Sequence, residues 1–361
     1  MPSPTGGPAA PKPSSDALIR LVVEKGWATR DQIQAAVQYQ ARKKVSIAEA
    51  FIELSILSEA QVRRALGGPK APPPVTTEPH PLADAIKGYR ILKCLGSGGM
   101  GDVYLAKQTS LDRLVALKVL PAHFSNDEAF IERFVIEARA AGKVFHENIV
   151  AGVDIGESNG RYFFAMEYVQ GPTLRQLIQK TGALAEDRAL DIACQVAAGL
   201  KHAYLHGLVH RDIKPANIMI APGNIAKICD FGLARDINDS AKTTGVVQSS
   251  PAYASPEQGR GRPDADHRSD MYSLGVTLFE MFTGERPFHA DTPAALLAKH
   301  ATVAPPSVDE IRPDLAPASI ALVKRLLRKD PKQRFETYDQ LIEAIQEIEE
   351  SSNEPESGDV P

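Results

Sequence analysis

The sequence predicts an α+β domain preceded by a small all-α domain. Three observations support this prediction. Prolines gather in two short stretches, five in residues 1–15 and six in residues 69–81, and these stretches divide the chain. Between them, apolar residues recur at helical spacing. After the second stretch, three β-type segments precede a helix that begins near Asp127.

Composition excludes several classes of protein. The chain has 361 residues, of which 43% are hydrophobic and 24% charged, as in an ordinary folded protein of about two domains. A net charge of −4 gives no sign of nucleic-acid binding. No apolar stretch reaches the ~18 residues of a membrane span, and no signal peptide is evident. The three cysteines lack CxxC spacing, which argues against disulfides and structural zinc. We therefore expect a cytoplasmic protein that is not a membrane receptor.

Charge and proline together predict the domain boundaries. Residues 1–70 hold ten Lys and Arg against six Asp and Glu, a net of +4, whereas residues 335–361 hold nine acids and neither Lys nor Arg. The acidic end is interpreted as a solvated helix with a frayed tail. The predicted division is a disordered tail (1–15), a helical regulatory or docking domain (16–68), a Pro-rich linker (69–87), the α+β domain (88–349) and an acidic disordered tail (350–361).

The first domain contains an internal repeat. Residues 23–33 align with residues 52–62, and each copy places Gln three residues after a Ser or Thr, as Thr29 with Gln32 and Ser58 with Gln61. This spacing is the capping-box signature of a helix start. We predict four short helices packed as two hairpins. Such a small core favours packing on a larger domain or self-association.

The α+β domain opens with a glycine-rich loop between two strands. The strand at 89–95 is followed by glycines at 96, 98 and 101, which allow backbone amides to approach phosphate oxygens. The same G-x-G-x-x-G string opens dinucleotide-binding domains, but there it enters a helix. Here it enters a second strand, at 103–107, so the dinucleotide interpretation is rejected.

A third strand, at 114–120, carries Lys118 among apolar residues. A lysine in a buried strand needs a partner, because an uncompensated charge is costly to bury. The following helix offers Glu137. A Lys–Glu pair of this kind suggests that Lys118 binds the α- and β-phosphates of a nucleotide.

The most informative cluster lies in the second half of the chain. His210-Arg211-Asp212-Ile213-Lys214-Pro215-Ala216-Asn217 is followed, 18 residues after Asp212, by Asp230-Phe231-Gly232. Two acids and an amide can place a base on an acceptor hydroxyl and ligate Mg²⁺ on a triphosphate, because Mg²⁺ favours oxygen ligands.

With these motifs in order, residues 89–349 resemble a bacterial eukaryotic-like (Hanks-type) Ser/Thr protein kinase. The resemblance implies a bilobal fold with a small β-rich lobe and a large helical lobe, ATP and Mg²⁺ as cofactors, and protein substrates with Ser or Thr acceptors. It also implies that Asp212 orients or deprotonates the acceptor, that Lys214 stabilises charge on the γ-phosphoryl group, and that Asn217 and Asp230 hold Mg²⁺. The ATP-binding residues it implies are Leu95, Gly96, Ser97, Gly98, Gly99, Met100, Gly101, Val103, Ala116, Lys118, Glu137, and, through their backbones at adenine, Glu167 and Val169.

The resemblance extends to regulation and scaffolding. Arg211 beside Asp212 is typical of kinases whose phosphorylated activation segment neutralises an arginine cluster, and Thr243 and Thr244 are the predicted autophosphorylation sites. Ser250 stands where relatives usually have Thr and keeps a hydroxyl that can bridge to Asp212 and Lys214. Glu257 is expected to pair with Arg334, and Asp270 to support the catalytic loop.

Two alternatives remain open. A pseudokinase scaffold would lack phosphoryl transfer, but Lys118, Asp212, Asn217 and Asp230 are all present. The first domain is faintly similar to the N-terminal domain of type II secretion and pilus-assembly ATPases, some of which bind cyclic di-GMP. The Arg-Leu-Gly-x-x-Leu start of the nucleotide-binding versions is largely missing here. We therefore expect this domain to dock a protein or self-associate rather than bind cyclic di-GMP.

Overall fold

A computed structural model describes the second domain almost throughout and part of the first. The chain divides into two compact units, Met1–Glu78 and Pro79–Pro361, and each is described here by itself. The described residues are 19, 22, 28–43, 47, 50, 51, 56, 85–98, 101–121, 124, 127–231, 235–236, 250–261 and 266–353. Within them, no helix is both long enough and apolar enough to cross a membrane.

The first unit contains the helix α2 (Arg30–Lys43), which begins at the predicted capping box. The backbone amide of Thr29 donates to the side chain of Gln32 (2.9 Å), and the amide of Gln32 donates to the Thr29 hydroxyl (3.3 Å). The prediction for Thr29 is thus confirmed, whereas Ser58 and Gln61 lie outside the described residues. A small apolar core gathers around this helix, formed by Val22, Ala36, Ile47, Ala50 and Phe51.

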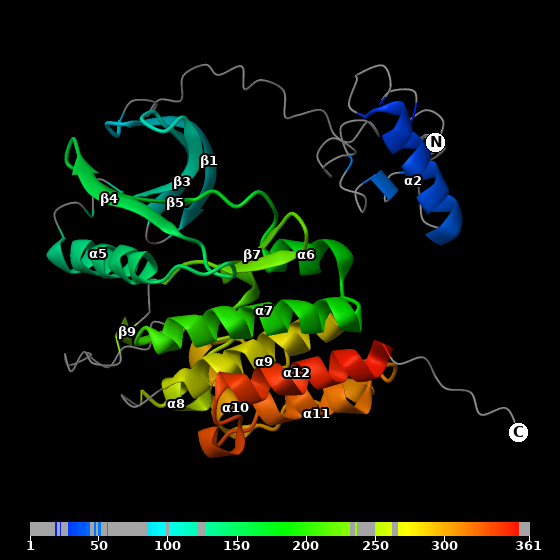
Figure 1. Ribbon diagram of the computed structural model, residues 1–361. Helices are drawn as coiled ribbons and strands as arrows, with labels where there is room; N and C mark the ends of the chain where they lie inside the picture. Colours follow the sequence, from blue (N-terminus) through cyan, green and yellow to red (C-terminus); the bar gives the residue numbers. More distant parts are fainter. Residues whose placement is uncertain are drawn as a thin grey trace, which may run out of the picture. The chain divides into compact units, whose positions relative to one another are not determined.

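The small lobe of the second unit is a five-stranded antiparallel sheet in the order β1-β2-β3-β5-β4. Its strands are β1 (Tyr89–Gly98), β2 (Gly101–Gln108), β3 (Arg113–Val119), β4 (Gly152–Ser158) and β5 (Arg161–Glu167). The predicted first three strands and the helix after them are confirmed. That helix, α5 (Glu128–Lys143), contributes Phe134 to a core with Leu120 and Phe164, and it lies below the sheet in Figure 1.

The large lobe is mainly helical, and Figure 1 shows its long helices stacked side by side. Its helices are α6 (Leu174–Thr181), α7 (Glu186–Leu205), α8 (Pro256–Gly259), α9 (His267–Thr283), α10 (Pro293–Thr302), α11 (Pro317–Leu326) and α12 (Tyr338–Asn353), with short 3₁₀ turns η2 (Pro215–Asn217), η3 (Val308–Glu310) and η4 (Pro331–Gln333). Two small sheets pair β6 (Leu208–Val209) with β9 (Arg235–Asp236) and β7 (Ile218–Ala221) with β8 (Ile225–Ile228).

Helix α9 is the buried centre of this lobe, and its ends are sharply defined. The side chain of Asp266 caps its first turn by accepting from the amide of Arg268, and Gly284 ends it in the left-handed conformation (φ +79°). In mid-helix, a Cβ on Gly275 would lie 2.6 Å from the Cβ of Leu326. Glycine at this position therefore allows α11 to pack closely against α9.

A buried ion pair ties α8 to the turn before α12. Arg334 donates two parallel hydrogen bonds to Glu257 (2.7 and 2.9 Å), and the side chain of Arg334 has no exposed surface. The same guanidinium also donates to the carbonyl of Arg268 at 2.7 Å. Although burial opposes ionisation, these donors hold the pKa of Glu257 below its ordinary value. The predicted partnership of Glu257 and Arg334 is confirmed.

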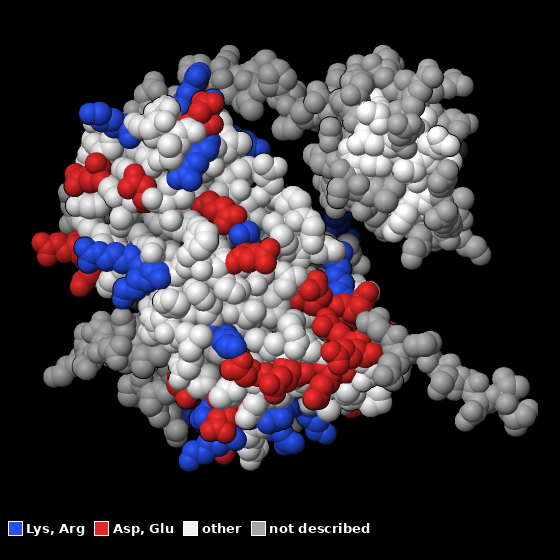
Figure 2. Space-filling model, in the orientation of Figure 1, with Lys and Arg blue, Asp and Glu red and all other residues white. Residues whose placement is uncertain are grey.

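The acidic end of the chain forms a helix, as predicted, but only one of its faces is solvated, because Leu341, Ile345 and Ile348 are buried in the core of the large lobe. Along α12, Asp339, Glu343 and Glu347 recur every four residues and are exposed, so they share one face, and Glu350 lies one turn further. Figure 2 shows acidic side chains gathered on the part of the surface over α12 and the start of α7. The tail after residue 353 lies outside the described residues.

Candidate active site

The catalytic loop, His210–Asn217, follows β6 and ends with the turn η2. It is held by one buried carboxylate. Asp270 of α9 accepts from the backbone amides of His210 (2.8 Å) and Arg211 (2.7 Å). Arg211 has φ +69°, a conformation that costs a residue with a side chain free energy unless its surroundings enforce it. Burial raises the pKa of Asp270, and its two amide donors oppose that rise. The expected supporting role of Asp270 is confirmed.

Asp212 lies at the centre of a closely connected polar cluster. Its Oδ2 accepts from Lys214 Nζ (2.5 Å) and Asn217 Nδ2 (3.2 Å), and its Oδ1 accepts from the backbone amide of Ser250 (2.9 Å). Lys214 Nζ also donates to the Ser250 hydroxyl at 2.7 Å. Ser250 therefore reaches Lys214 through its hydroxyl, as expected, but reaches Asp212 through its amide. The cluster fixes one carboxylate and one ammonium group side by side.

Asp230 is placed beside the catalytic loop by the backbone contacts of the preceding residue, Cys229. The amide of Cys229 donates to the carbonyl of Asn217 (2.9 Å), and its carbonyl lies 3.2 Å from Nε2 of His210. Asp230 follows with φ +66°, and the ring of Phe231 packs edge-on against His210. These contacts place the Asp230 carboxylate, which is partly exposed, next to the catalytic loop.

Asn217 and Asp230 offer the oxygen ligands that a hard divalent cation prefers. The Asn217 amide nitrogen donates to the backbone carbonyl (2.9 Å) and side chain of Asp212, which leaves its carbonyl oxygen available as an acceptor. The Asp230 carboxylate is 43% exposed. The donor set fits Mg²⁺.

Lys118 reaches the same region from β3. Its Nζ lies 3.6 Å from Oδ1 of Asp230, and its side chain is nearly buried. Glu137, the partner expected from the sequence, lies in α5, but its side chain is outside the described part of the structure. The structure thus identifies Asp230 as a partner of Lys118 that the sequence analysis did not name.

Strand register shows which residues line the cleft face of the sheet. Val103 pairs with Lys118, and Ala116 lies two residues before Lys118, so all three side chains share one face. Leu95 occupies a bulge in β1, and the hairpin closes with Gly98 opposite Gly101. Gly99 and Met100, the tip of this hairpin, lie outside the described residues, as do Thr243 and Thr244.

Gly101 is required by geometry. It has φ +128°, and a Cβ there would lie 2.4 Å from the carbonyl oxygen of Val119. A side chain would therefore force β2 away from β3 at the loop that is expected to cover the nucleotide.

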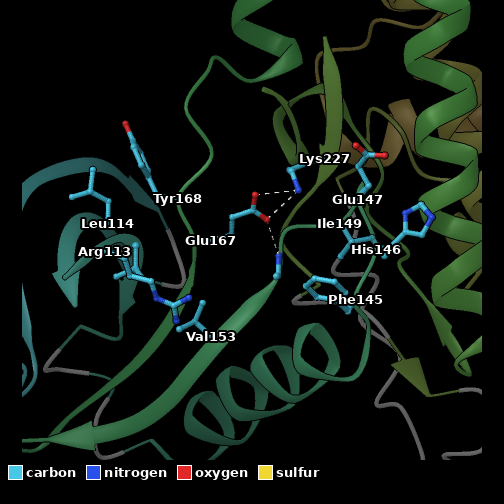
Figure 3. A pocket seen from close by; sticks show the side chains of 12 residues that line it. Arg113, Leu114, Phe145, His146, Glu147, Ile149, Val153, Glu167, Tyr168 and Lys227 are labelled. Atoms are coloured by element: carbon cyan, nitrogen blue, oxygen red, sulfur yellow. Dashed lines mark hydrogen bonds and ion pairs between the residues drawn. The ribbon is translucent and has the colours of Figure 1, made fainter. Parts of the chain in front are cut away.

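A pocket of about 510 Å³, lined by none of the residues of the polar cluster around Asp212, lies beside Glu167 at the end of β5 (Figure 3). The Glu167 carboxylate pairs with Lys227 of β8 (3.1 Å) and accepts from the amide of Ala151 (3.3 Å). Phe145, 85% exposed, and Leu114 add apolar walls. Sequence analysis missed Lys227, because sixty residues separate it from Glu167 and no motif joins them. Val169, two residues after Glu167, is buried.

The segment after Ser250 is fixed from several sides. We call Ser250–Tyr253 the substrate loop. The Ser273 hydroxyl of α9 donates to the carbonyl of Tyr253 (2.8 Å), and the Tyr253 hydroxyl donates to Glu280 (2.6 Å). Five residues after Tyr253, in α8, the Gln258 side chain donates to the carbonyl of Arg211 at 2.8 Å. The catalytic loop is therefore joined to the substrate loop through Ser250 and to α8 through Gln258.

The two-lobed fold, with its polar cluster between the lobes, defines a protein kinase, and comparisons with known proteins agree. The protein kinase domain family matches residues 89–345. The chain belongs to this family, as the sequence analysis predicted.

The similar proteins include several bacterial serine/threonine-protein kinases. PknB of Mycolicibacterium smegmatis is 41% identical over 268 residues, covering 72% of this chain and 42% of that protein. PrkC of Bacillus subtilis is 40% identical over 254 residues, covering 70% and 39%. The crystal structure of the Mycobacterium tuberculosis PknI kinase domain matches with a TM-score of 0.58 at 31% identity, covering 73% of this chain and 97% of that one. The chain thus spans about two fifths of the length of the curated relatives it matches.

Proposed function

We propose that this protein transfers the γ-phosphoryl group of ATP to Ser or Thr hydroxyls of protein substrates. The observation that carries the proposal is the cluster of Asp212, Lys214, Asn217 and Ser250, in which a carboxylate and an ammonium group are held within hydrogen-bonding distance. Phosphoryl transfer requires mainly positioning and electrostatic stabilisation, and this cluster supplies both.

Each residue has a definite task in this proposal. Asp212 accepts the hydrogen bond, and then the proton, of the acceptor hydroxyl. Lys214 neutralises charge that develops on the transferred group. Asn217 and Asp230 are the residues that would hold Mg²⁺, which when bound would neutralise charge on the phosphates. Lys118, together with Glu137, positions the α- and β-phosphates.

The remaining assignments concern ATP binding by the small lobe. The hairpin residues Gly96, Ser97, Gly98, Gly99, Met100 and Gly101 cover the phosphates, while Leu95, Val103 and Ala116 contact the base and Glu167 and Val169 offer it backbone groups. The shared face of Val103, Ala116 and Lys118 supports this arrangement.

The decisive experiment compares phosphate incorporation by wild type and Asp212→Asn. With Mg-ATP and a generic Ser/Thr acceptor such as casein, we expect Asp212→Asn to lose at least about 100-fold in rate. The matched control is Asp187→Asn, an exposed aspartate at the start of α7, which should retain wild-type activity. Equal incorporation by wild type and Asp212→Asn would refute the assignment of Asp212. ATP binding by thermal shift, with no transfer by wild type, would favour the pseudokinase scaffold instead.

Regulation is proposed to act through Thr243 or Thr244. A phosphate there would form charge-assisted bonds with Arg211 and order the activation segment. After incubation with Mg-ATP, phosphosite mapping should find at least one of them modified in wild type and neither in Asp212→Asn.

For residues 16–68, the capping box and the small core support a helical domain that docks a protein or self-associates. The division of the chain after Glu78 supports a boundary in the proline-rich stretch. Calorimetry of the full chain with cyclic di-GMP should show no heat; micromolar binding would favour the similarity to secretion ATPases. A cytoplasmic location remains a prediction, supported by three unbridged cysteines.

A further inference from the structure

One buried histidine connects the substrate loop to α10. His300 has no exposed surface, and its Nε2 lies 3.1 Å from the carbonyl oxygen of Ala252. A carbonyl oxygen can only accept a hydrogen bond, so Nε2 must carry the proton. The contact is therefore a directed bond from His300 to the substrate loop.

The second ring nitrogen of His300 continues the connection. Nδ1 lies 3.0 Å from the hydroxyl of Tyr272, and Lys329 Nζ donates to that hydroxyl at 3.2 Å. The Tyr272 hydroxyl accepts from Lys329 and donates its own proton to Nδ1 of His300. Every proton along the chain from Lys329 to Ala252 then has one position, and this arrangement requires a neutral His300.

The surroundings keep His300 neutral and pack closely against its ring. Burial and the charges of Lys329 and Arg286 lower the pKa of His300 to about 4, against a smaller opposing effect of the Ala252 carbonyl. Phe288 packs edge-on against the ring, with centroids 4.8 Å apart, and Tyr272 packs similarly at 5.7 Å. Lys329 also lies over the Phe288 ring, 4.6 Å from its centroid. Phe288 thus packs against both His300 and Lys329, two members of the polar chain.

We propose that His300, Tyr272 and Lys329 form a buried relay that fixes the Ala252 carbonyl and thereby positions the substrate loop for its protein substrate. This inference rests on the proposed function. Ser250 at the start of the loop contacts Asp212 and Lys214, so the next residues border the place where the acceptor hydroxyl must lie. His300 is a positioning residue in this scheme, because it acts through Ala252.

The relay predicts a selective kinetic effect. Because the nucleotide-binding residues lie mainly on the small lobe, loss of His300 should weaken binding of the protein substrate and leave ATP binding unchanged. His300→Leu removes the donor to Ala252, and we expect the KM for casein to rise about 5- to 10-fold, as for the loss of one buried hydrogen bond. The KM for ATP should stay within about twofold.

Conservative replacement separates positioning from packing. In His300→Gln, the amide can still donate to Ala252, so casein KM should recover to within about threefold of wild type. His289→Gln, at an exposed histidine, is the control and should behave as wild type. Equal changes in the KM for casein and for ATP, or no change in either, would overturn the proposal.

The protonation pattern can be tested without any activity, so failure of the relay is distinguishable from failure of the proposed function. In protein labelled with ¹⁵N-histidine, long-range ¹H–¹⁵N spectra distinguish the two neutral tautomers, and the His300 signal is the one missing from His300→Gln. We expect the Nε2-protonated form, unchanged between pH 5.5 and 7.5. An Nδ1-protonated ring, or a midpoint near the ordinary value of 6.5, would refute the relay even if the kinase is active.

Discussion

Mild acid should destabilise the large lobe through His300. Burial, Lys329 and Arg286 lower the pKa of this histidine to about 4, against an ordinary value of 6.5. At pH values between 4 and 6.5, His300 is protonated in the unfolded chain and neutral in the folded state. The free energy of unfolding should therefore fall as the pH drops from 6.5 to 4, and the full contribution should be present only above pH 6.5.

The expected size follows from the two pKa values. A pH of 5 is 1.5 units below the pKa of 6.5 that His300 has in the unfolded chain, whereas in the folded state His300 is still neutral at this pH. Each unit corresponds to about 1.4 kcal/mol, so the loss at pH 5 is about 2 kcal/mol relative to pH 7. Solvent screening does not reduce this free-energy change, because the ring is fully buried.

Urea unfolding followed by far-UV circular dichroism measures this effect. Tryptophan fluorescence is unsuitable, because the single tryptophan, Trp27, belongs to the first unit. Wild type and His300→Gln are compared at pH 7 and pH 5, with His289→Gln as the control for an exposed histidine. Wild type and the control should each lose about 2 kcal/mol more between the two pH values than His300→Gln does. An equal loss in all three proteins would refute the reasoning.

Four further outcomes can be measured. Arg334→Met should lower the free energy of unfolding by about 3–5 kcal/mol by stranding the buried Glu257, and adding Glu257→Gln should recover part of that loss; strict additivity in urea unfolding would contradict a direct pair. Lys329→Met should raise the free energy of unfolding at pH 7 by about 1–2 kcal/mol, because burial lowers the pKa of Lys329 to about 8 and thus disfavours its charge in the folded state. The KM for casein should nevertheless rise, because Lys329 no longer donates to Tyr272. An unchanged free energy of unfolding would argue against a cost of burying this charge. Gly101→Ala should introduce about 1–3 kcal/mol of backbone strain, and it should therefore lower the melting temperature and raise the KM for ATP. Gly160→Ala is the control, since Gly160 also has positive φ but lies in open space, and it should leave the KM for ATP unchanged. Thr29→Ala should destabilise the first unit by about 1 kcal/mol in a Trp27 fluorescence melt, and no shift would mean that the capping box contributes nothing.

The contacts that sequence analysis predicted are those that local geometry or an ordered set of motifs determines. The capping box at Thr29 depends only on helix geometry, so three-residue spacing was sufficient. Glu257 and Arg334 lie far apart in the chain, but each stands at a recognisable motif position, and the resemblance to the kinase family supplied the pairing. The sequence analysis predicts that the glycine loop enters a strand rather than a helix, and the pairing of β1 with β2 confirms this.

The relay could not be predicted in the same way. Ala252, Tyr272, His300 and Lys329 come from four separate segments, and none of these residue types identifies its partner by spacing. The partners of Lys118 and Glu167 illustrate the same limit. Asp230 and Lys227 approach them only because β-strand register and loop packing bring distant segments together. Such contacts depend on tertiary packing and leave no local pattern.

The substrate loop is held by different chemistry at Ser250 and at Ala252, and this difference has a functional consequence. At Ser250 the anchors are the Asp212 carboxylate, which accepts from the Ser250 amide, and the Lys214 ammonium group, which donates to the Ser250 hydroxyl. At Ala252 the anchor is a neutral, buried histidine that loses its acceptor at Nδ1 once it is protonated. Acidification toward pH 4 should therefore break the hydrogen bond from Tyr272 to Nδ1, while Nε2 keeps donating to Ala252 and Tyr253 stays bonded to Ser273 and Glu280. Protein-substrate binding should then weaken through reorientation of the His300 ring, because Tyr272 no longer holds Nδ1 in place.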